Sequence, residues 1–286
     1  MTNRRGLSLV ELLIAMTVAG IVGASLIALL LSQGRWSERT TAERDSRAAA
    51  RGPASILAAE LRMVDPSWGV EAATTQSVTI RIPYAMGLFC GVSGSTYIVQ
   101  LLPNDAALMA QPGHSGYAIR NNGGFYTWYQ EAGKAASTAT TSCTGATPAV
   151  EILPGTTLVA LTVPGSPPTA PDPGMPVMLA RRIRYSYANS GTTGLRMLYR
   201  EVLDASGGDA VAEEIGGPFT EASAARFTFF TRTSPTTAVA TVPSPLTDIL
   251  GLQVGLPGRA ERNPRMATGT VSADLSTAFF FTNRAN

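Results

Sequence analysis

The clearest hydrophobic pattern in the chain is a continuous apolar run near its amino terminus. From Leu12 to Leu31 the sequence contains no charged residue. A helix of about 20 residues, rising about 1.5 Å per residue, is long enough to cross the roughly 30 Å hydrocarbon layer of a bilayer. Arg4 and Arg5 precede the run, and the positive-inside rule places such a basic start in the cytoplasm. The pattern therefore predicts a single membrane span with everything after Leu31 on the far side.

We expect the helix to continue beyond the membrane. Residues 33–51 are rich in Ala, Glu and Arg and contain no proline. Arg39, Glu43 and Arg47 place opposite charges four residues apart, which supports a solvated helical face.

Gly52 and Pro53 predict a break or kink at this point, because proline cannot donate the backbone hydrogen bond of a helix interior. Leu57, Leu61 and Val64 follow at helical spacing and form an apolar stripe that can dock on a domain core. A straight helix over residues 7–64 would be roughly 85 Å long. That length exceeds what a membrane anchor requires and suits the core of a filament.

From residue 65 the pattern changes to short alternating runs separated by Gly, Pro, Asn and Ser, which is typical of antiparallel strands. The candidate strands are 78–82, 96–102, 125–130, 158–163, 178–187, 195–202, 226–231 and 249–256. Residues 182–187 and 195–200 predict a hairpin around an Asn-Ser-Gly turn. Residues 164–176 and 204–217 predict loops, and 278–284 predicts a buried last strand. The predicted fold is α+β: a long amino-terminal helix followed by a large antiparallel β-rich head.

Composition limits the chemistry that the chain can perform. The 286 residues are 45% hydrophobic and 15% charged, with 22 Lys and Arg against 20 Asp and Glu. This near-neutral balance does not favour a nucleic-acid binder. One His and two Cys leave little material for histidine catalysis or for a zinc cluster. We expect no catalytic, cofactor-binding or metal site, and therefore no enzyme.

Three weaker signals favour structural explanations. His114 and Ser115 are adjacent in sequence, which is not the geometry of a nucleophile and its base, so we expect a loop histidine. Alternating aromatic residues at 125–129 suggest a sugar-stacking face, but a strand that packs on both sides explains them better. Four acidic residues suggest a calcium site, but a solvated loop explains them better. They are Asp204, Asp209, Glu213 and Glu214.

Five arginines on the predicted hairpin suggest contacts with DNA phosphates, but a solvated strand face is the interpretation that we favour. They are Arg181, Arg182, Arg184, Arg196 and Arg200.

Glu11 is the most informative residue of the amino terminus. A charge at membrane depth costs roughly 2.5 to 3.5 kcal/mol, so such a residue usually has a partner. If the chain is cut between Gly6 and Leu7, Leu7 becomes the new amino terminus and Glu11 lies one helical turn away. In a helical assembly, the amine of Leu7 in one subunit could then neutralise Glu11 of a neighbour.

Gly6 followed by Leu7-Ser8-Leu9-Val10-Glu11 and an apolar helix resembles the prepilin cleavage and methylation motif of type IV pilins and type II secretion pseudopilins. The resemblance implies cleavage after Gly6 by a prepilin peptidase, N-methylation of Leu7, and a role for Glu11 in subunit docking. The helix lacks the mid-span proline of major pilins, with Ala28 at the matching place. This difference favours a minor pilin, W-like, or a J-like pseudopilin.

The resemblance divides the chain into a leader (1–6), a membrane-spanning half-helix (7–31), an extracytoplasmic half-helix (32–64) and a head (65–286). It implies a subunit in the inner membrane that later enters a pilus or pseudopilus, in a tip or priming complex with other minor subunits. The choice between a pilus and a secretion system stays open. The alternative is an extracytoplasmic enzyme or adhesin held by a signal anchor.

Cys90 and Cys143 both lie in loop-like surroundings of the segment expected outside the cytoplasm. Disulfides form and persist in such oxidising compartments. We therefore predict a bridge between them.

Overall fold

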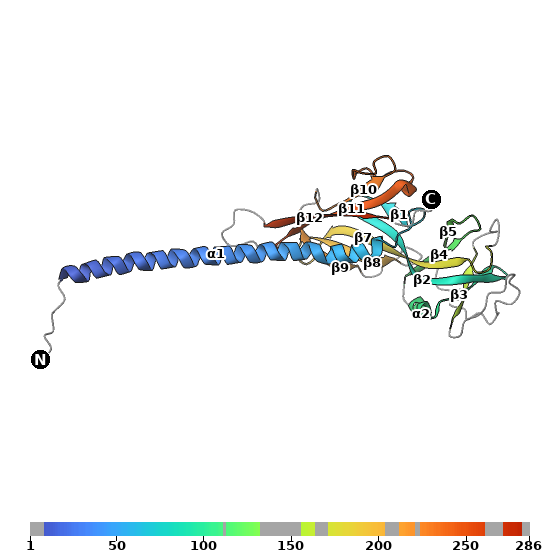
Figure 1. Cartoon of the computed structure of the whole chain (residues 1–286), viewed down its shortest axis with the longest axis horizontal. Helices are drawn as coiled ribbons and strands as arrows, with labels where there is room; N and C mark the ends of the chain where they lie inside the picture. Colours follow the sequence, from blue (N-terminus) through green and yellow to red (C-terminus); the bar gives the residue numbers. More distant parts are fainter. Residues whose placement is uncertain are drawn as a thin grey trace.

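The computed structural model describes residues 9–110, 113–131, 156–163, 171–203, 212–220, 224–260 and 271–281. One long helix, α1 (Leu9–Leu61), projects from an elongated head made of strands (Figure 1). Its 53 residues correspond to about 80 Å. The predicted α+β class is therefore correct.

Helix α1 is continuous through Gly52 and Pro53, so the predicted break does not occur. Pro53 is buried, and its ring lies against β9 (Glu213–Phe219) of the head: a Cβ added to Gly216 would approach the Pro53 ring to 2.5 Å. Packing of the ring on the sheet offsets the loss of one helical hydrogen bond, which explains why the helix continues.

Within the described residues, twelve strands form one sheet, and every pair of neighbours is antiparallel. Besides β9, the strands are β1 (Val70–Ala73), β2 (Ser77–Ser93), β3 (Thr96–Leu101), β4 (His114–Arg120), β5 (Tyr126–Gln130), β6 (Leu158–Thr162), β7 (Pro176–Asn189), β8 (Arg196–Leu203), β10 (Phe227–Thr231), β11 (Ile249–Arg259) and β12 (Ser272–Phe280). Three short helices complete the described elements: α2 (Pro103–Ala106), η1 (Leu108–Ala110) and η2 (Leu246–Asp248).

The two longest strands, β2 and β7, pair from Ser77 with Ser186 to Leu88 with Pro176 and run through both parts of the head. In the part next to α1, they are flanked by β1 and β8; in the far part, they are flanked by β3 and β4. Each part has its own hydrophobic core. The proximal lobe is built around Leu57, Ile183 and Phe227, and the distal lobe around Tyr97, Tyr117 and Leu179.

Each of the eight candidate strands overlaps a strand of the structure, with ends that agree to within a residue except in β2, β7 and β11, which extend farther, and the predicted hairpin is the pair β7–β8. Three strands were missed: β1, β4 and β9. Strand β9 contains two glycines and a proline, so its sequence resembles that of a loop. Residues 213–217, which we expected to be part of a loop at 204–217, belong to this strand. Strand β2 extends far beyond residue 82, with register shifts after Pro83 and after Phe89 that absorb its irregular sequence.

The last strand is only half buried, contrary to our expectation. β12 ends at Phe280, and its side chains alternate between the core and solvent. Phe279 is 7% exposed, whereas Phe280 is 48% exposed and packs against Phe230. Residues 282–284 of the predicted strand lie outside the described residues.

Candidate functional site

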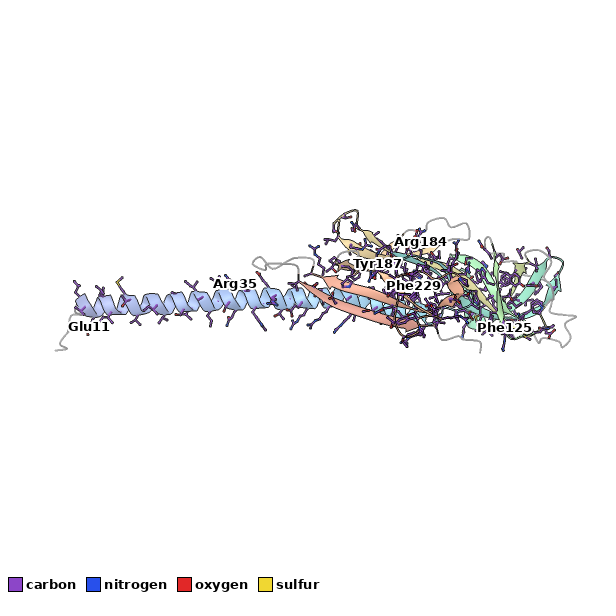
Figure 2. The ribbon with its side chains drawn as sticks, turned by 90° about the horizontal axis from the view of Figure 1, so that it is seen from above. Glu11, Arg35, Phe125, Arg184, Tyr187 and Phe229 are labelled. Atoms are coloured by element: carbon purple, nitrogen blue, oxygen red, sulfur yellow. The ribbon has the colours of Figure 1, made fainter. Side chains whose placement is uncertain are left out.

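The candidate site is the amino-terminal part of α1, which is apolar and on which no strand of the described head packs. Large hydrophobic side chains from Leu9, which is 81% exposed, to Leu31 point outward on every side of the helix (Figure 2). The first buried residue of α1 is Ala42. About 33 residues, or about 50 Å of helix, therefore stand free of the head.

A surface of this kind is unstable in water. Each exposed Leu, Ile or Val side chain gives up roughly 1.5 to 3 kcal/mol of burial free energy, and contiguous apolar patches of this size mark membrane or protein contacts. Among the described residues, α1 is the one helix long and apolar enough to cross a membrane. The exposed apolar surface of residues 9–31 therefore suits a contact with lipid or with other apolar helices.

Glu11 is the acidic residue in the first described turn of α1. A carboxylate at this end of a helix interacts favourably with the helix dipole. The predicted processing residues, Gly6 and Leu7, lie outside the described residues. Cleavage and N-methylation at these positions therefore remain predictions.

The carboxyl-terminal half of α1 is held by the head along a stripe at helical spacing. Its buried residues are Ala42, Ser46, Ala50, Pro53, Leu57, Glu60 and Leu61. The first four are small, and the sheet meets them with glycine: a Cβ on Gly258 of β11 would lie 1.9 Å from the carbonyl oxygen of Ser46. The backbones of α1 and β11 thus approach each other closely. The predicted apolar stripe of Leu57, Leu61 and Val64 forms the last part of this buried stripe.

A buried polar cluster, which we call the Glu60 cluster, fixes the end of α1 to the sheet. Glu60 of α1, Arg200 of β8 and Tyr185 of β7 form it. Nη2 of Arg200 donates a 2.7 Å hydrogen bond to Oε1 of Glu60, and the Tyr185 hydroxyl donates to Oε2. Burial, together with the negative charge of Glu60, raises the pKa of Tyr185 above its usual value. Burial lowers the pKa of Arg200, but the hydrogen bond and charge of Glu60 outweigh it, so this pKa is raised.

The arginine cluster of the hairpin is not the solvated face that we expected. Besides Arg200, Arg182 bonds with Glu71 of β1, and Arg184 bonds with Glu201 at 2.8 Å. Arg196 lies over the Tyr187 ring at 5.7 Å. Sequence alone missed Glu60, Glu71 and Glu201 as partners because the three acids lie on different elements. These cross-strand and helix-to-sheet pairs hold the proximal lobe together.

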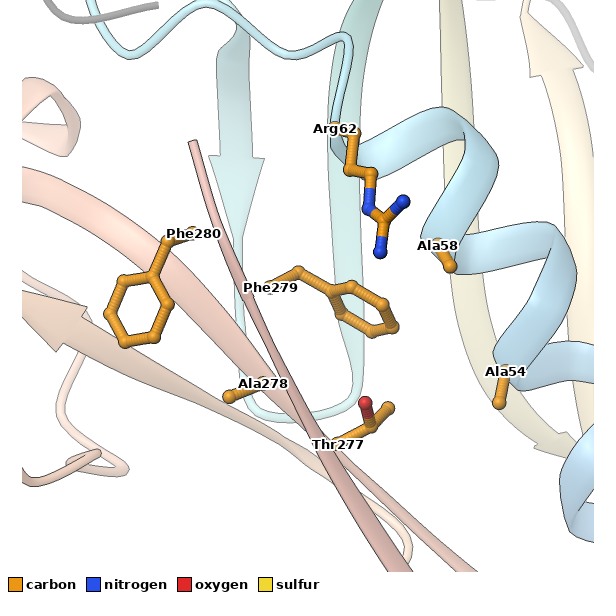
Figure 3. Close-up of a pocket in the computed structure, with 7 residues that line it drawn as sticks. All are labelled: Ala54, Ala58, Arg62, Thr277, Ala278, Phe279 and Phe280. Carbon is orange, nitrogen blue, oxygen red and sulfur yellow. The ribbon is translucent and has the colours of Figure 1, made fainter. Parts of the chain in front are cut away.

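A pocket of about 370 Å³ lies between α1 and the edge strand β12, which pairs with β11 (Figure 3). Ala54, Ala58 and Arg62 form its helix side, and 277–280 form its strand side. The Phe279 ring points toward the helix, whereas Phe280 points away from it. The small alanines leave this space open next to the helix.

His114 is not in a loop, contrary to our expectation. It begins β4 and is buried, with Nε2 at 3.1 Å from Oε2 of Glu131 and Nδ1 at 2.9 Å from the Tyr84 hydroxyl. Ser115 instead donates to the carbonyl oxygen of Ala180 at 3.2 Å. The serine and the histidine therefore have separate partners, and the cluster joins strands of the distal lobe.

The aromatic residues of β5 pack on both faces of their strand. Trp128 stacks on Trp68 at 5.2 Å between ring centroids, with the Arg81 guanidinium 4.8 Å from the Trp128 ring. Tyr129 points the other way and stacks on Tyr117 at 5.3 Å in the distal core. This arrangement is the two-sided packing that we favoured.

Two further predictions fall partly outside the described chain. Cys90 does not lie in a loop: it is buried in β2 and takes part in a disulfide. Cys143 lies outside the described residues, so its pairing remains a prediction.

Of the four acidic residues considered for calcium, Asp204 and Asp209 also lie outside the described residues, while Glu213 and Glu214 are exposed at the start of β9. In the part of the chain that is described, no group of three or more His, Cys, Asp or Glu side chains is placed to hold a metal ion.

Comparison with known proteins adds one finding to this geometry. No curated protein and no solved structure matches the chain. The family model described as the prokaryotic N-terminal methylation motif matches residues 1–27. These residues include Gly6, Leu7 and Glu11 and most of the exposed apolar helix. The chain thus carries the signal of type IV pilins and pseudopilins at the start of a helix whose apolar half stands free of the head.

Proposed function

We propose that this protein is a minor pilin or pseudopilin that assembles through α1 into a type IV pilus or a type II secretion pseudopilus. The observation that carries the proposal is the coincidence of the methylation motif with about 33 residues of unsupported helix. A signal anchor requires only enough helix to cross the bilayer. Here the helix continues without a break into the core of the head, which makes it a spine of the whole subunit.

The role is assembly and not catalysis. A prepilin peptidase removes residues 1–6 and the Leu7 amine is methylated, which leaves Glu11 at the fifth position of the mature chain. In the filament, the amine of one subunit and Glu11 of a neighbour neutralise each other. The head of about 220 residues suits a tip or priming complex with other minor subunits.

Before assembly, the subunit resides in the inner membrane with its head outside the cytoplasm. Trp36, which is 72% exposed and five residues beyond Leu31, supports this position. Tryptophan is enriched where a membrane meets water, because its ring is apolar and its N–H is polar. Arg35 and Arg39 flank it and suit the same headgroup layer.

The test is mass spectrometry of the mature amino terminus of the protein purified from its membrane. We expect a chain that begins with N-methylated Leu7. An intact Met1, or cleavage near Ser32, would instead support the alternative, an enzyme or adhesin held by a signal anchor. A strain that lacks prepilin peptidase is the control, and its product should retain residues 1–6.

A second experiment separates the two assemblies. A deletion strain is compared with its parent for surface motility and for release of exoproteins. Loss of motility alone assigns the subunit to a pilus, and loss of secretion alone assigns it to a secretion system.

A further inference from the structure

The outer side of β12 is a free edge of the sheet. Within the described residues, β12 pairs with β11 alone, in a ladder without a register shift. At one end of the ladder the N–H of Ala260 donates to the carbonyl oxygen of Val271, and at the other end the N–H of Phe281 donates to that of Leu250. Bonding toward a neighbour alternates along an antiparallel strand, so the odd-numbered residues of β12 bond to β11. The backbone groups of the even-numbered residues point away from the sheet: Ser272, Asp274, Ser276, Ala278 and Phe280.

This edge lacks the features that usually prevent strand addition. Proteins protect exposed edges with lysine, proline, bulges or very short strands. Strand β12 has nine residues, contains no lysine, arginine or proline, and carries Asp274 as its one charged residue. Its length and its even register therefore suit pairing with a further strand.

Both faces of the edge carry apolar surface that a further strand would cover. On the face toward α1, the pocket separates the Phe279 ring from the small side chains of Ala54 and Ala58 (Figure 3). On the other face, the exposed ring of Phe280 lies 4.6 Å from the ring of Phe230, measured between centroids. Successive side chains of a strand point to opposite faces. One side chain of an added strand would thus enter the pocket, and the next would cover Phe280.

We propose that the outer edge of β12 binds an extended segment of a different protein by strand addition. Main-chain hydrogen bonds hold the segment, and its alternate side chains provide specificity. An apolar side chain fills the pocket beside Ala58, and a second one covers Phe280 on the other face.

Asp274 shares the face of Phe280 and defines the charge of the segment. It is exposed and forms no ion pair among the described residues. Opposite charges on directly facing strand residues attract each other. The segment therefore carries a lysine or arginine opposite Asp274, six residues from the apolar side chain that covers Phe280.

A second β12 edge does not suit this role. Near the start of β12, its partner Gly258 lies against Ser46 of α1. Near its end, Phe279 lies beside Ala58, farther along the helix. Strand and helix thus run in the same direction, and antiparallel pairing of two β12 edges would point two α1 helices in opposite directions. Given the membrane anchoring of the proposed function, on which this exclusion rests, both helices cannot insert. Parallel pairing in register would instead place one Asp274 beside the other.

The test uses full-length protein purified in detergent from the membrane of the producing cells. The probe is a fluorescent peptide, VLTVTTKTT, designed to pair antiparallel with β12 so that its first residue faces Phe280 and its lysine faces Asp274. We expect saturable binding by fluorescence anisotropy. Asp274→Lys should weaken it by roughly two- to fivefold, as expected for an exposed ion pair. Replacement of the peptide's lysine by glutamate should restore binding to this variant.

Backbone methylation of the peptide separates strand addition from other apolar contacts. An N-methyl group on its fifth residue, which faces Ser276, removes a ladder hydrogen bond and should weaken binding by roughly tenfold. The matched control carries the N-methyl group on the sixth residue, which faces Leu275 and whose N–H points away from β12. This peptide should bind like the unmodified probe.

The pocket is tested by Ala58→Leu, whose larger side chain occupies it and should weaken binding by roughly tenfold. Ala59→Leu, at the exposed neighbouring position, is the control and should bind normally. Near-ultraviolet circular dichroism verifies that the head of each variant is folded. The methylated peptides test the same edge on the unaltered protein, so the result does not depend on the folding of Ala58→Leu.

Three results would overturn the inference: no saturable binding, equal binding of the two methylated peptides, or a dimer of this chain that the probe dissociates. The last result would assign the edge to a second copy. Mass spectrometry of the amino terminus in the same preparation distinguishes this failure from that of the proposed function. An N-methylated Leu7 without peptide binding removes the inference alone, whereas an unprocessed terminus with peptide binding removes the proposed function alone.

Discussion

Glu60, near the end of the long helix, accepts a 2.7 Å hydrogen bond from Arg200 of a strand 140 residues later in the chain. Both side chains are largely buried, with 11% and 16% of their surfaces exposed. Removing one member of such a pair leaves an uncompensated charge and costs more than the pair itself contributes. The helix and the head therefore depend on each other at this point.

We expect Glu60→Ala to lower the free energy of unfolding of the head by about 2–4 kcal/mol, because Arg200 loses its carboxylate partner. Thermal or urea unfolding of the full chain in detergent, followed by near-ultraviolet circular dichroism, measures this change. Glu43→Ala is the matched control, since its exposed partner Arg39 lies 3.3 Å away on the same helix and such pairs contribute about 0.5 kcal/mol. Equal effects of the two variants would contradict the importance of the Glu60 cluster.

Gly258 sets the distance between α1 and β11. Gly258→Ala should destabilise the fold by about 1–3 kcal/mol, because the new methyl group would overlap the Ser46 backbone and force the helix away. Hydrogen exchange of residues 42–53 should rise in the same variant. Gly191→Ala, at a position where a Cβ would meet nothing within 4 Å, is the control and should change neither quantity.

Cys90 and Cys143 should yield no free thiol until the denatured protein is reduced. Closing a loop of about 50 residues contributes about 4 kcal/mol in the chain-entropy model, so reduction should lower Tm. The double variant Cys90→Ser/Cys143→Ser should unfold like the reduced wild type. Two titratable thiols in the unreduced, denatured chain would disprove the bridge.

The head should lose stability in alkaline solution. Burial raises the pKa of Tyr84, Tyr117, Tyr185 and Tyr187 above the usual value near 10. As the pH rises, the unfolded chain loses these protons before the folded chain does. The stabilisation that the four protonated hydroxyls contribute is therefore fully present below about pH 10 and decreases as the pH rises above it. Each such tyrosine adds about 1.4 kcal/mol per pH unit to the slope in this range.

Unfolding curves between pH 8 and 11 measure this slope. Tyr187→Phe should reduce it by the contribution of one proton, whereas Tyr199→Phe serves as the control substitution on β8. A slope that Tyr187→Phe does not change would show that this hydroxyl does not couple to folding.

The parts of the fold that sequence predicted are those determined by local periodicity. The apolar helix, the hairpin of β7 and β8 and most strands follow from alternation over a few residues. Strand β9 was missed because Gly216 and Gly217 serve close contacts with Pro53 of α1 and with Met197 that no local pattern reveals. The break that we expected at Pro53 does not occur for the same reason: the packing of Pro53 against Gly216 depends on residues far away in sequence.

In the candidate site, too, the residues that belong to a local motif could be predicted from sequence, and those that depend on distant contacts could not. Gly6, Leu7 and Glu11 are recognisable because a short motif contains all three. The Glu60 cluster brings together elements separated by more than 120 residues, and its members look like ordinary surface residues in the sequence. The sequence therefore shows the methylation motif, and the structure shows how the helix is attached to the head.

The two long strands β2 and β7 have a mechanical consequence. They pass without interruption from the distal lobe to the lobe that holds α1. A tensile force applied to the far end of the head would be transmitted through the backbones of β2 and β7. It would act on the helix as a shear force along the buried stripe of α1. Resistance would then come from many antiparallel hydrogen bonds loaded together, so the head would transmit tension as a unit before its lobes separate.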